Sequence, residues 1–448
     1  MTSSGANAVA LPTAEPGGGT PPGAAPLDYA PPSLAPVPSL RRNFSWTLAG
    51  NVVYAACQWG VLVALAKFGS METVGEFAWG LAVVSPVMLL ANLQLREVQA
   101  TDARGQFRFS DYLSLRLLCV LLGLLAVGGI AAVAAPDARV GKVVVLIGLA
   151  KGLDGISDIM FGLFQKRERM KPVSLTLAVN GVVTVAAVAA VMAAGLSVVW
   201  AAGASAFGSA AALAVAAASA RRVAGPGGLR PHWDGAALGR LAGLAGPLGF
   251  VALLISLNTN MPRYFVEHHF GDAALGAFAA IAYVMMAGTM VTMALAQSAS
   301  ARFARHLAES DVRGFYRLLG KLVSVGAGLG LVGVVVAVVA GRPLLAFLYR
   351  PEYAEAAGPF AWLMAAAGVA YAASFLNTAM VAARCVKSQA VLFAIVTATG
   401  AAASAVLVPR YGLTGAAWAV LLTMCVQICG ASAVLWRALS AYGARAGA

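Results

Sequence analysis

Three ionisable side chains, Lys151, Asp154 and Asp158, lie inside a stretch of the sequence that otherwise reads as a membrane-spanning helix. Their spacing of three and then four residues places all three on one helix face. A charged side chain in a membrane helix costs roughly 2.5 to 3.5 kcal/mol on insertion scales, so such residues usually face a cavity. Here the lysine could bind an anion and the carboxylates could bind H⁺ or Na⁺. The alternative is a self-neutralising cluster that only fixes helix packing.

A second set of polar side chains lies in the apolar segment 44–66. Asn51 and Gln58 share one helix face with Thr47 and Tyr54. Lipid is a poor environment for such a stripe, so it predicts a hydrated interior that could accept sugars. Each of these residues could instead make an ordinary hydrogen bond between helices.

The segment 238–260 ends in Asn258 and Asn260, and Pro262 and Arg263 follow directly. Because proline has no backbone N–H, we expect it to interrupt the helix there and to free carbonyl oxygens beside the two amides. Arg263 and Arg384 join Lys151 as candidates for binding a phosphate group, for which fixed positive charge is required. Both arginines lie near expected membrane boundaries, where they could simply extend toward the headgroups.

The composition indicates an all-α polytopic membrane protein. Of the 448 residues, 60% are hydrophobic and 11% are charged, and the mean hydropathy is +0.80. Apolar runs of about 20 residues, the length that crosses a bilayer, recur along the chain and predict twelve transmembrane helices. Connections and helix ends on one side of these helices hold 23 of the 31 Lys and Arg residues, against seven on the other. This bias predicts that both termini are cytoplasmic, and it explains the net charge of +13 without a nucleic-acid partner.

A short pattern occurs twice, about 200 residues apart. Phe68-Gly69 with Gly75 and Phe77 matches Phe270-Gly271 with Gly276 and Phe278. The offset equals six predicted helices, so the pattern predicts two six-helix lobes related by an axis along the membrane normal, an architecture typical of transporters.

The lobes define the expected domain boundaries. Residues 1–38 contain nine of the 20 prolines and no Lys or Arg, which predicts a disordered cytoplasmic tail. The first lobe is expected at 39–222, a cytoplasmic linker at 223–235, the second lobe at 236–438 and a short cytoplasmic tail at 439–448.

Several of these residues carry a resemblance to a known family. The run 257–267, with Phe270-Gly271, Leu275-Gly276 and 280–283, resembles the seventh and eighth helices of bacterial polysaccharide-unit flippases, the Wzx-like branch of the MOP superfamily. Further similar patterns are Ser157-Asp158, Gly162, Gln165, 167–170, and 40–44 with Asn51 and Gln58. The resemblance covers about residues 40–437.

The resemblance implies a flippase that moves undecaprenyl-diphosphate-linked oligosaccharide units across the bacterial inner membrane by alternating access, for O-antigen or exopolysaccharide synthesis. Its partners would be the lipid-linked substrate, membrane lipids and polysaccharide-assembly proteins such as a polymerase. The alternatives are an ion-coupled small-molecule antiporter of the same superfamily, a membrane polysaccharide polymerase, and a structural scaffold.

No catalytic or cofactor motif accompanies the charged residues. There is no phosphate-binding loop, so we expect neither ATP hydrolysis nor other enzymatic chemistry. The five cysteines and four histidines show no metal-ligand spacing, so no metal or cofactor is expected. Any coupling to an ion gradient would use Asp154 and Asp158.

Overall fold

The computed structural model describes residues 40–102, 105–225, 228–309, 311–383 and 385–446. All regular structure in these ranges is helical. The elements are α1 Leu40–Phe68, α2 Met71–Asn92, α3 Leu95–Thr101, α4 Phe109–Ala134, α5 Ala138–Lys166, α6 Met170–Ala193, α7 Val198–Ala224, α8 Gly235–Ala308, α9 Val312–Leu348, the 3₁₀ helix η1 Pro351–Ala356, α10 Ala357–Ala382 and α11 Val386–Ala446. The expected tail 1–38 lies outside the described residues.

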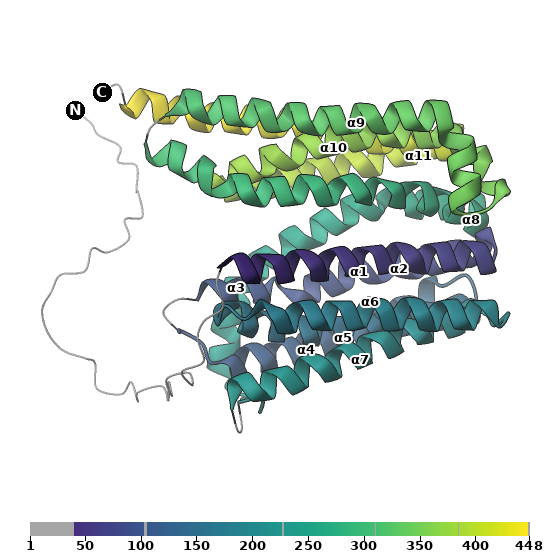
Figure 1. Cartoon of the computed structure of the whole chain (residues 1–448), viewed down its shortest axis with the longest axis horizontal. Coiled ribbons are helices and arrows are strands. Elements are labelled where there is room, and N and C mark those ends of the chain that lie inside the picture. The colour runs from purple at the N-terminus through teal and green to yellow at the C-terminus, as the bar shows by residue number, and fades with distance from the viewer. Residues whose placement is uncertain (1–39, 103–104, 226–227, 310, 384, 447–448) are drawn as a thin grey trace, which may run out of the picture. The chain divides into compact units, whose positions relative to one another are not determined.

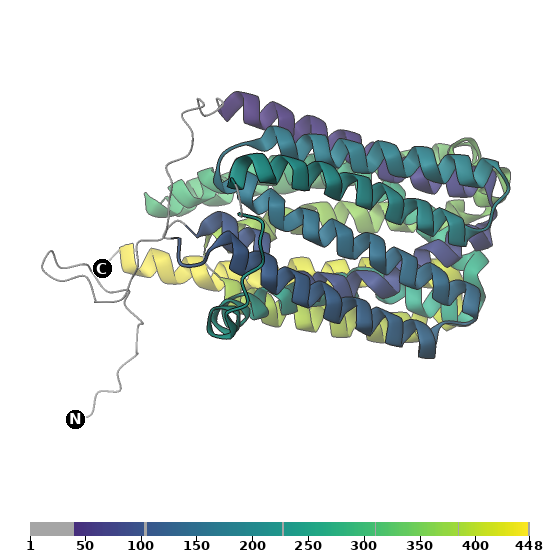
Figure 2. The same cartoon turned by 90° about the horizontal axis from the view of Figure 1, so that it is seen from below.

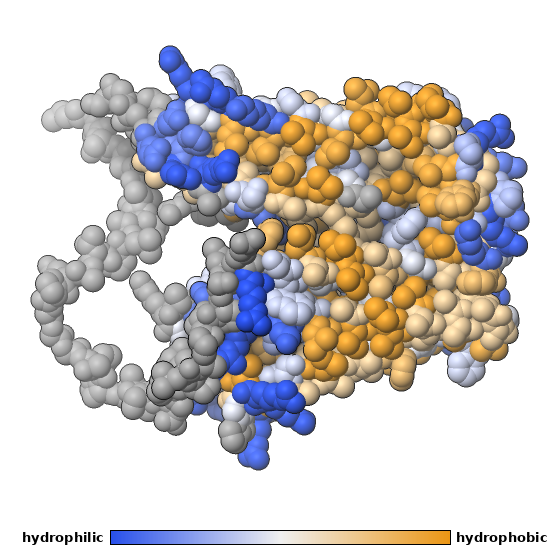
Figure 3. Space-filling view, in the orientation of Figure 1, coloured by the Kyte–Doolittle hydropathy of each residue, from blue (hydrophilic) through white to orange (hydrophobic). Residues whose placement is uncertain are grey.

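The long helices run along a common direction (Figures 1 and 2). Among the described residues, nine helices are long and apolar enough to cross a membrane. Hydrophobic residues cover the middle of the face seen in Figure 3, and hydrophilic residues gather toward both ends of the helices. This pattern is the one that a bilayer requires, since the exposed middle contacts hydrocarbon and the ends contact water. The protein is therefore a multi-pass membrane protein.

Two of the long helices are broken by a glycine. α8 is interrupted at Gly271, where φ is 74°, and α11 at Gly412, where φ is 57°. A positive φ is readily adopted by glycine, because it has no Cβ. The expected interruption at Pro262 is wrong: α8 keeps helical backbone angles through that residue, since its non-helical angles occur at Gly271. Pro262 is buried within α8.

We call α1 to α7 the first half of the structure and α8 to α11 the second half. The two meet mainly where α2 packs against α8. A Cβ added to Gly75 would lie 1.9 Å from the backbone oxygen of Asp272, and one added to Gly276 would lie 2.0 Å from that of Met71. These two glycines are the ones that the sequence pattern matches to each other, and both lie in the contact between the halves.

Hydrogen bonds between the halves cluster where α1 and α9 end. Lys67 Nζ donates to the carbonyl of Phe347 (3.0 Å), and Arg350 donates to that of Gly69 (2.8 Å). Trp59 Nε1 donates to the Tyr349 hydroxyl at 3.3 Å. The largest hydrophobic core also spans both halves, with Phe77, Phe278 and Phe360 among its members.

Candidate functional site

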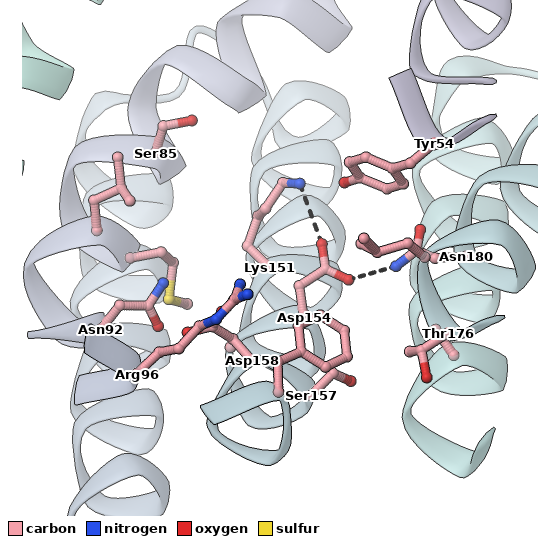
Figure 4. A pocket seen from close by; sticks show the side chains of 16 residues that line it. Tyr54, Ser85, Asn92, Arg96, Lys151, Asp154, Ser157, Asp158, Thr176 and Asn180 are labelled. Carbon is pink, nitrogen blue, oxygen red and sulfur yellow. Dashed lines mark hydrogen bonds and ion pairs between the residues drawn. The ribbon is translucent and has the colours of Figure 1, made fainter. Parts of the chain in front are cut away.

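The predicted charged residues line a cavity of about 390 Å³ in the first half of the structure. Lys151, Asp154 and Asp158 all lie on α5 and face this cavity, as the sequence spacing predicted (Figure 4). Other lining residues come from α1, α2, α3, α6 and α7: they include Tyr54, Ser85, Asn92, Arg96, Thr176 and Asn180. None of the lining residues belongs to the second half, so this site is enclosed by one repeat.

Small residues on α5 allow its neighbours to approach closely. A Cβ on Gly148 would lie 2.9 Å from Val127 of α4, and one on Gly152 would lie 3.1 Å from Val120. A Cβ on Gly155 would lie 2.8 Å from the side-chain oxygen of Asn92. Glycines at this spacing are a common helix-packing device in membranes. They bring α4 and the end of α2 against the charged part of α5.

Lys151 and Asp154 form one ion pair of the cavity. Lys151 Nζ lies 3.2 Å from Asp154 Oδ2, and Asn180 of α6 donates to Asp154 Oδ1 at 2.8 Å (Figure 4). The Lys151 and Asp154 side chains are 31% and 24% exposed, because both face the cavity. Both carboxylate oxygens of Asp154 have a partner, and the Lys151–Asp154 pair carries no net charge when both residues are ionised.

Asp158 lies between two arginines. Its Oδ1 is 3.3 Å from Arg96 Nη1, and its Oδ2 is 3.3 Å from Arg116 Nη2. Arg116 is fully buried, whereas the Arg96 side chain is 28% exposed and lines the cavity. Arg116 also donates to the side-chain oxygen of Asn92, but its Nε has no hydrogen-bond partner among the described residues. Two guanidinium groups therefore lie against one carboxylate at this end of the cavity, and Glu97 of α3 also interacts electrostatically with both arginines.

The sequence did not identify Arg96, Arg116, Asn92 or Asn180 as site residues. In the sequence, Arg96 and Arg116 contributed only to the excess of Lys and Arg that predicts which side of the membrane is cytoplasmic. One feature of the sequence could have indicated Arg116. It lies seven residues after the start of α4 at Phe109, which is further into the membrane helix than a typical boundary arginine. A buried cation needs a carboxylate, and Asp158 had no partner assigned from the sequence.

Gln58 and Arg263 meet in a second, much smaller cavity between the halves. They line a space of about 10 Å³ together with Tyr283, enough for a single water molecule. Arg263 Nη1 also donates to Asn260 Oδ1 at 3.0 Å, and Asn260 is buried on α8. The structure therefore separates these candidates from the charged cavity on α5.

The remaining candidates have individual environments. Asn51 is exposed and donates to the carbonyl of Thr47 in its own helix at 2.8 Å. Asn258 has a buried side-chain oxygen with no partner among the described residues, close to Gly400 of α11. Arg384 lies outside the described residues. Within the described ranges, no group of three or more His, Cys, Asp or Glu side chains could hold a metal ion.

Comparison with known proteins identifies the family. The model of the polysaccharide biosynthesis protein family matches residues 40–303. This chain belongs to that family. It is similar to the capsular polysaccharide biosynthesis protein CapF of Staphylococcus aureus, with 22% identity over 394 residues that span 86% of this chain and 97% of CapF.

Solved structures show that this family member has the fold of MOP-superfamily transporters. An inward-facing multidrug resistance MATE transporter matches 87% of this chain and 95% of its own, with a TM-score of 0.72 and 11% identity. The lipid II flippase MurJ in an inward closed conformation gives a TM-score of 0.66 at 12% identity, covering 87% of this chain and 86% of its own. An outward-facing MATE transporter gives 0.59 at 13% identity, over 90% and 95% of the two chains.

Proposed function

We propose that this polysaccharide biosynthesis protein is a flippase for undecaprenyl-diphosphate-linked oligosaccharide units. It moves them from the cytoplasmic to the periplasmic leaflet of a bacterial inner membrane, and it catalyses no covalent step. The family and the MOP fold support a membrane role in polysaccharide synthesis. The observation that carries the proposal is the pair of arginines beside Asp158, one of which lines the cavity, because a diphosphate needs fixed cations inside the membrane.

The proposed topology has twelve transmembrane helices with both termini in the cytoplasm. Nine candidate helices in the described ranges are long and apolar enough to span the membrane. Two more spans arise because α8 and α11 are each divided by a glycine, and the more highly charged α5 is the twelfth. The first lobe comprises 39–222, the linker 223–235 and the second lobe 236–438. Alternating access then follows from movement of the two lobes about the α2–α8 contact.

Arg96 is the proposed diphosphate ligand. Its side chain is partly exposed to the cavity, and its ion pair with Asp158 is accessible to a competing anion. A phosphate can take the place of Asp158 on Arg96, while Arg116 continues to neutralise the carboxylate. Lys151 lies in the same cavity and contributes a second cation.

Amide and hydroxyl groups around these cations are the proposed sugar ligands. Asn92 and Asn180 belong to the charged cavity. The other candidates are proposed to contact the substrate at other stages of transport. They are Asn51, Gln58, Asn258, Asn260, Arg263 and Arg384. Among these, Asn258 is the best supported sugar ligand, since its buried side-chain oxygen has no partner among the described residues and can accept a hydrogen bond.

Asp154 is the proposed site of ion coupling. One lysine and one amide bind it, whereas two permanently charged arginines bind Asp158. Asp158 is the ion-pair partner of both arginines, so we assign it a structural role and assign ion coupling to Asp154.

The test is transport of a fluorescent lipid-linked oligosaccharide by the purified protein in proteoliposomes. We expect Arg96→Gln to slow flipping roughly 10- to 100-fold, the value of one charge-assisted hydrogen bond. Arg317→Gln, which removes an exposed charge on α9, should leave the rate unchanged. Equal rates for wild type and Arg96→Gln would refute the role of this arginine.

A small-molecule antiporter is the second candidate, because the MATE transporter gives a higher TM-score than MurJ. The same proteoliposomes distinguish the two functions. Proton- or sodium-driven uptake of a cationic drug, without flipping of the labelled lipid, would establish the antiporter and reject the flippase.

A further inference from the structure

A separate cavity of about 350 Å³ opens at the end of the first half where α4 begins and α5 and α7 end. Three arginines line it: Arg108 before α4, Arg167 after α5, and Arg230 in the connection from α7 to α8. His232 is on the same wall. The transport proposal assigns no role to this cavity.

The carboxylate beside this cavity already has partners. Asp111 Oδ2 accepts the backbone N–H of Arg108 at 3.0 Å, and Asp111 Oδ1 lies 3.1 Å from His232 Nδ1. Arg167 donates to the carbonyl of Val223. In the part of the chain that the structure describes, Arg108 and Arg230 form no ion pair, so two guanidinium groups are available to an anion.

The cavity is also partly apolar. Phe109 and Leu163 line it beside the arginines. Further along α4, on the face away from Phe109, the leucines Leu118, Leu121, Leu122 and Leu125 are exposed, as expected of a helix that contacts hydrocarbon. A ligand with a phosphate group and hydrocarbon chains fits this lining, because the phosphate reaches the arginines while the first part of the chains contacts Phe109 and Leu163.

We propose that this cavity binds the headgroup of an anionic phospholipid. The lipid would link the α4–α5 end to the connection between the halves, since Arg108 and Arg230 belong to these two regions. Binding of a lipid here does not depend on the proposed transport function, because the cavity shares no lining residue with the charged cavity on α5. A free phosphate compound shares the same headgroup chemistry, and the experiment separates the two.

The experiment counts lipids bound to the full-length protein by native mass spectrometry after titration with phosphatidylglycerol or phosphatidylcholine. We expect one tightly bound phosphatidylglycerol on the wild-type protein. The double variant Arg108→Gln/Arg230→Gln should bind it roughly 25-fold more weakly, about fivefold for each arginine near a membrane surface. Arg221→Gln/Arg222→Gln is the matched control, because it removes two exposed charges at the end of α7 outside the cavity.

Three results would overturn the proposal. Equal phosphatidylglycerol affinity in the double variant, the control and the wild type excludes these arginines. If the wild type binds phosphatidylcholine as tightly as phosphatidylglycerol, recognition of the anionic headgroup is excluded. Binding of inorganic phosphate at the same concentration as the lipid, with the same loss in the double variant, identifies a soluble phosphate compound instead. Should the double variant fail to fold, Arg230→Gln alone, in an exposed connection, gives the same comparison.

Discussion

At the scale of single residues, Arg116 shows that a charge buried in a membrane protein requires an oppositely charged partner. Its side chain is fully buried, and Asp158 is its ion-pair partner. An unpaired charge at such a position is far more costly than a paired one. The position of Asp158 is therefore explained by the buried charge of Arg116.

We predict that Asp158→Asn lowers the free energy of unfolding by roughly 1 to 3 kcal/mol, because it leaves Arg116 buried without a carboxylate. The measurement is thermal unfolding of the protein in detergent. Adding Arg116→Met to that variant should recover most of the loss, since no buried charge then remains. No recovery in the double variant would contradict the explanation.

Arg96 binds the same carboxylate but is partly exposed. Exposed ion pairs contribute little to stability, roughly 0 to 1 kcal/mol. Arg96→Gln should therefore affect transport much more than unfolding, and its unfolding temperature serves as a control for the transport assay. This separation distinguishes a ligand-binding arginine from a structural one.

At the scale of helices, glycine determines how closely α2 and α8 approach. Gly75 and Gly276 lie where the two helices contact, and any Cβ there would overlap with backbone. Backbone atoms cannot move aside as a flexible side chain can. The contact between the halves therefore depends on two residues without side chains.

We predict that Gly75→Ala destabilises the protein by roughly 1 to 3 kcal/mol, as overpacking usually does. Gly128→Ala is the matched control: Gly128 lies in α4, and a Cβ there would meet nothing within 4 Å. The control should be neutral or slightly stabilising, because alanine favours the helix by roughly 0.5 to 1 kcal/mol. Thermal unfolding of both variants under one set of conditions makes the comparison, and equal effects would rule out the packing argument.

At the scale of the whole molecule, the topology can be tested by labelling. Starting from a chain in which the five native cysteines are replaced, Ser197→Cys should react with a membrane-impermeant maleimide in intact spheroplasts. Arg313→Cys should react only after permeabilisation, because its connection belongs to the side rich in Lys and Arg. The reverse labelling pattern would place the termini in the periplasm.

The sequence by itself determined the membrane class, the all-helical fold and the face of α5 that carries Lys151, Asp154 and Asp158. These features follow from hydropathy and from helical spacing, which are local properties of the chain. The family resemblance stated from short motifs is also confirmed. The two glycines that the repeat matches, Gly75 and Gly276, both lie in the contact between α2 and α8.

Only the tertiary structure decided which partners the charged residues have. Arg96 and Arg116 come from α3 and α4, and no sequence spacing specifies how these helices lie against α5. The course of the chain at Pro262 was also decided by the tertiary structure, since α8 continues through this proline and is broken at Gly271 instead. The same holds for Gln58 and Arg263, which meet across the two halves and away from the main cavity. Helical period fixes one face of one helix, whereas a site requires several helices whose relative positions are set by packing.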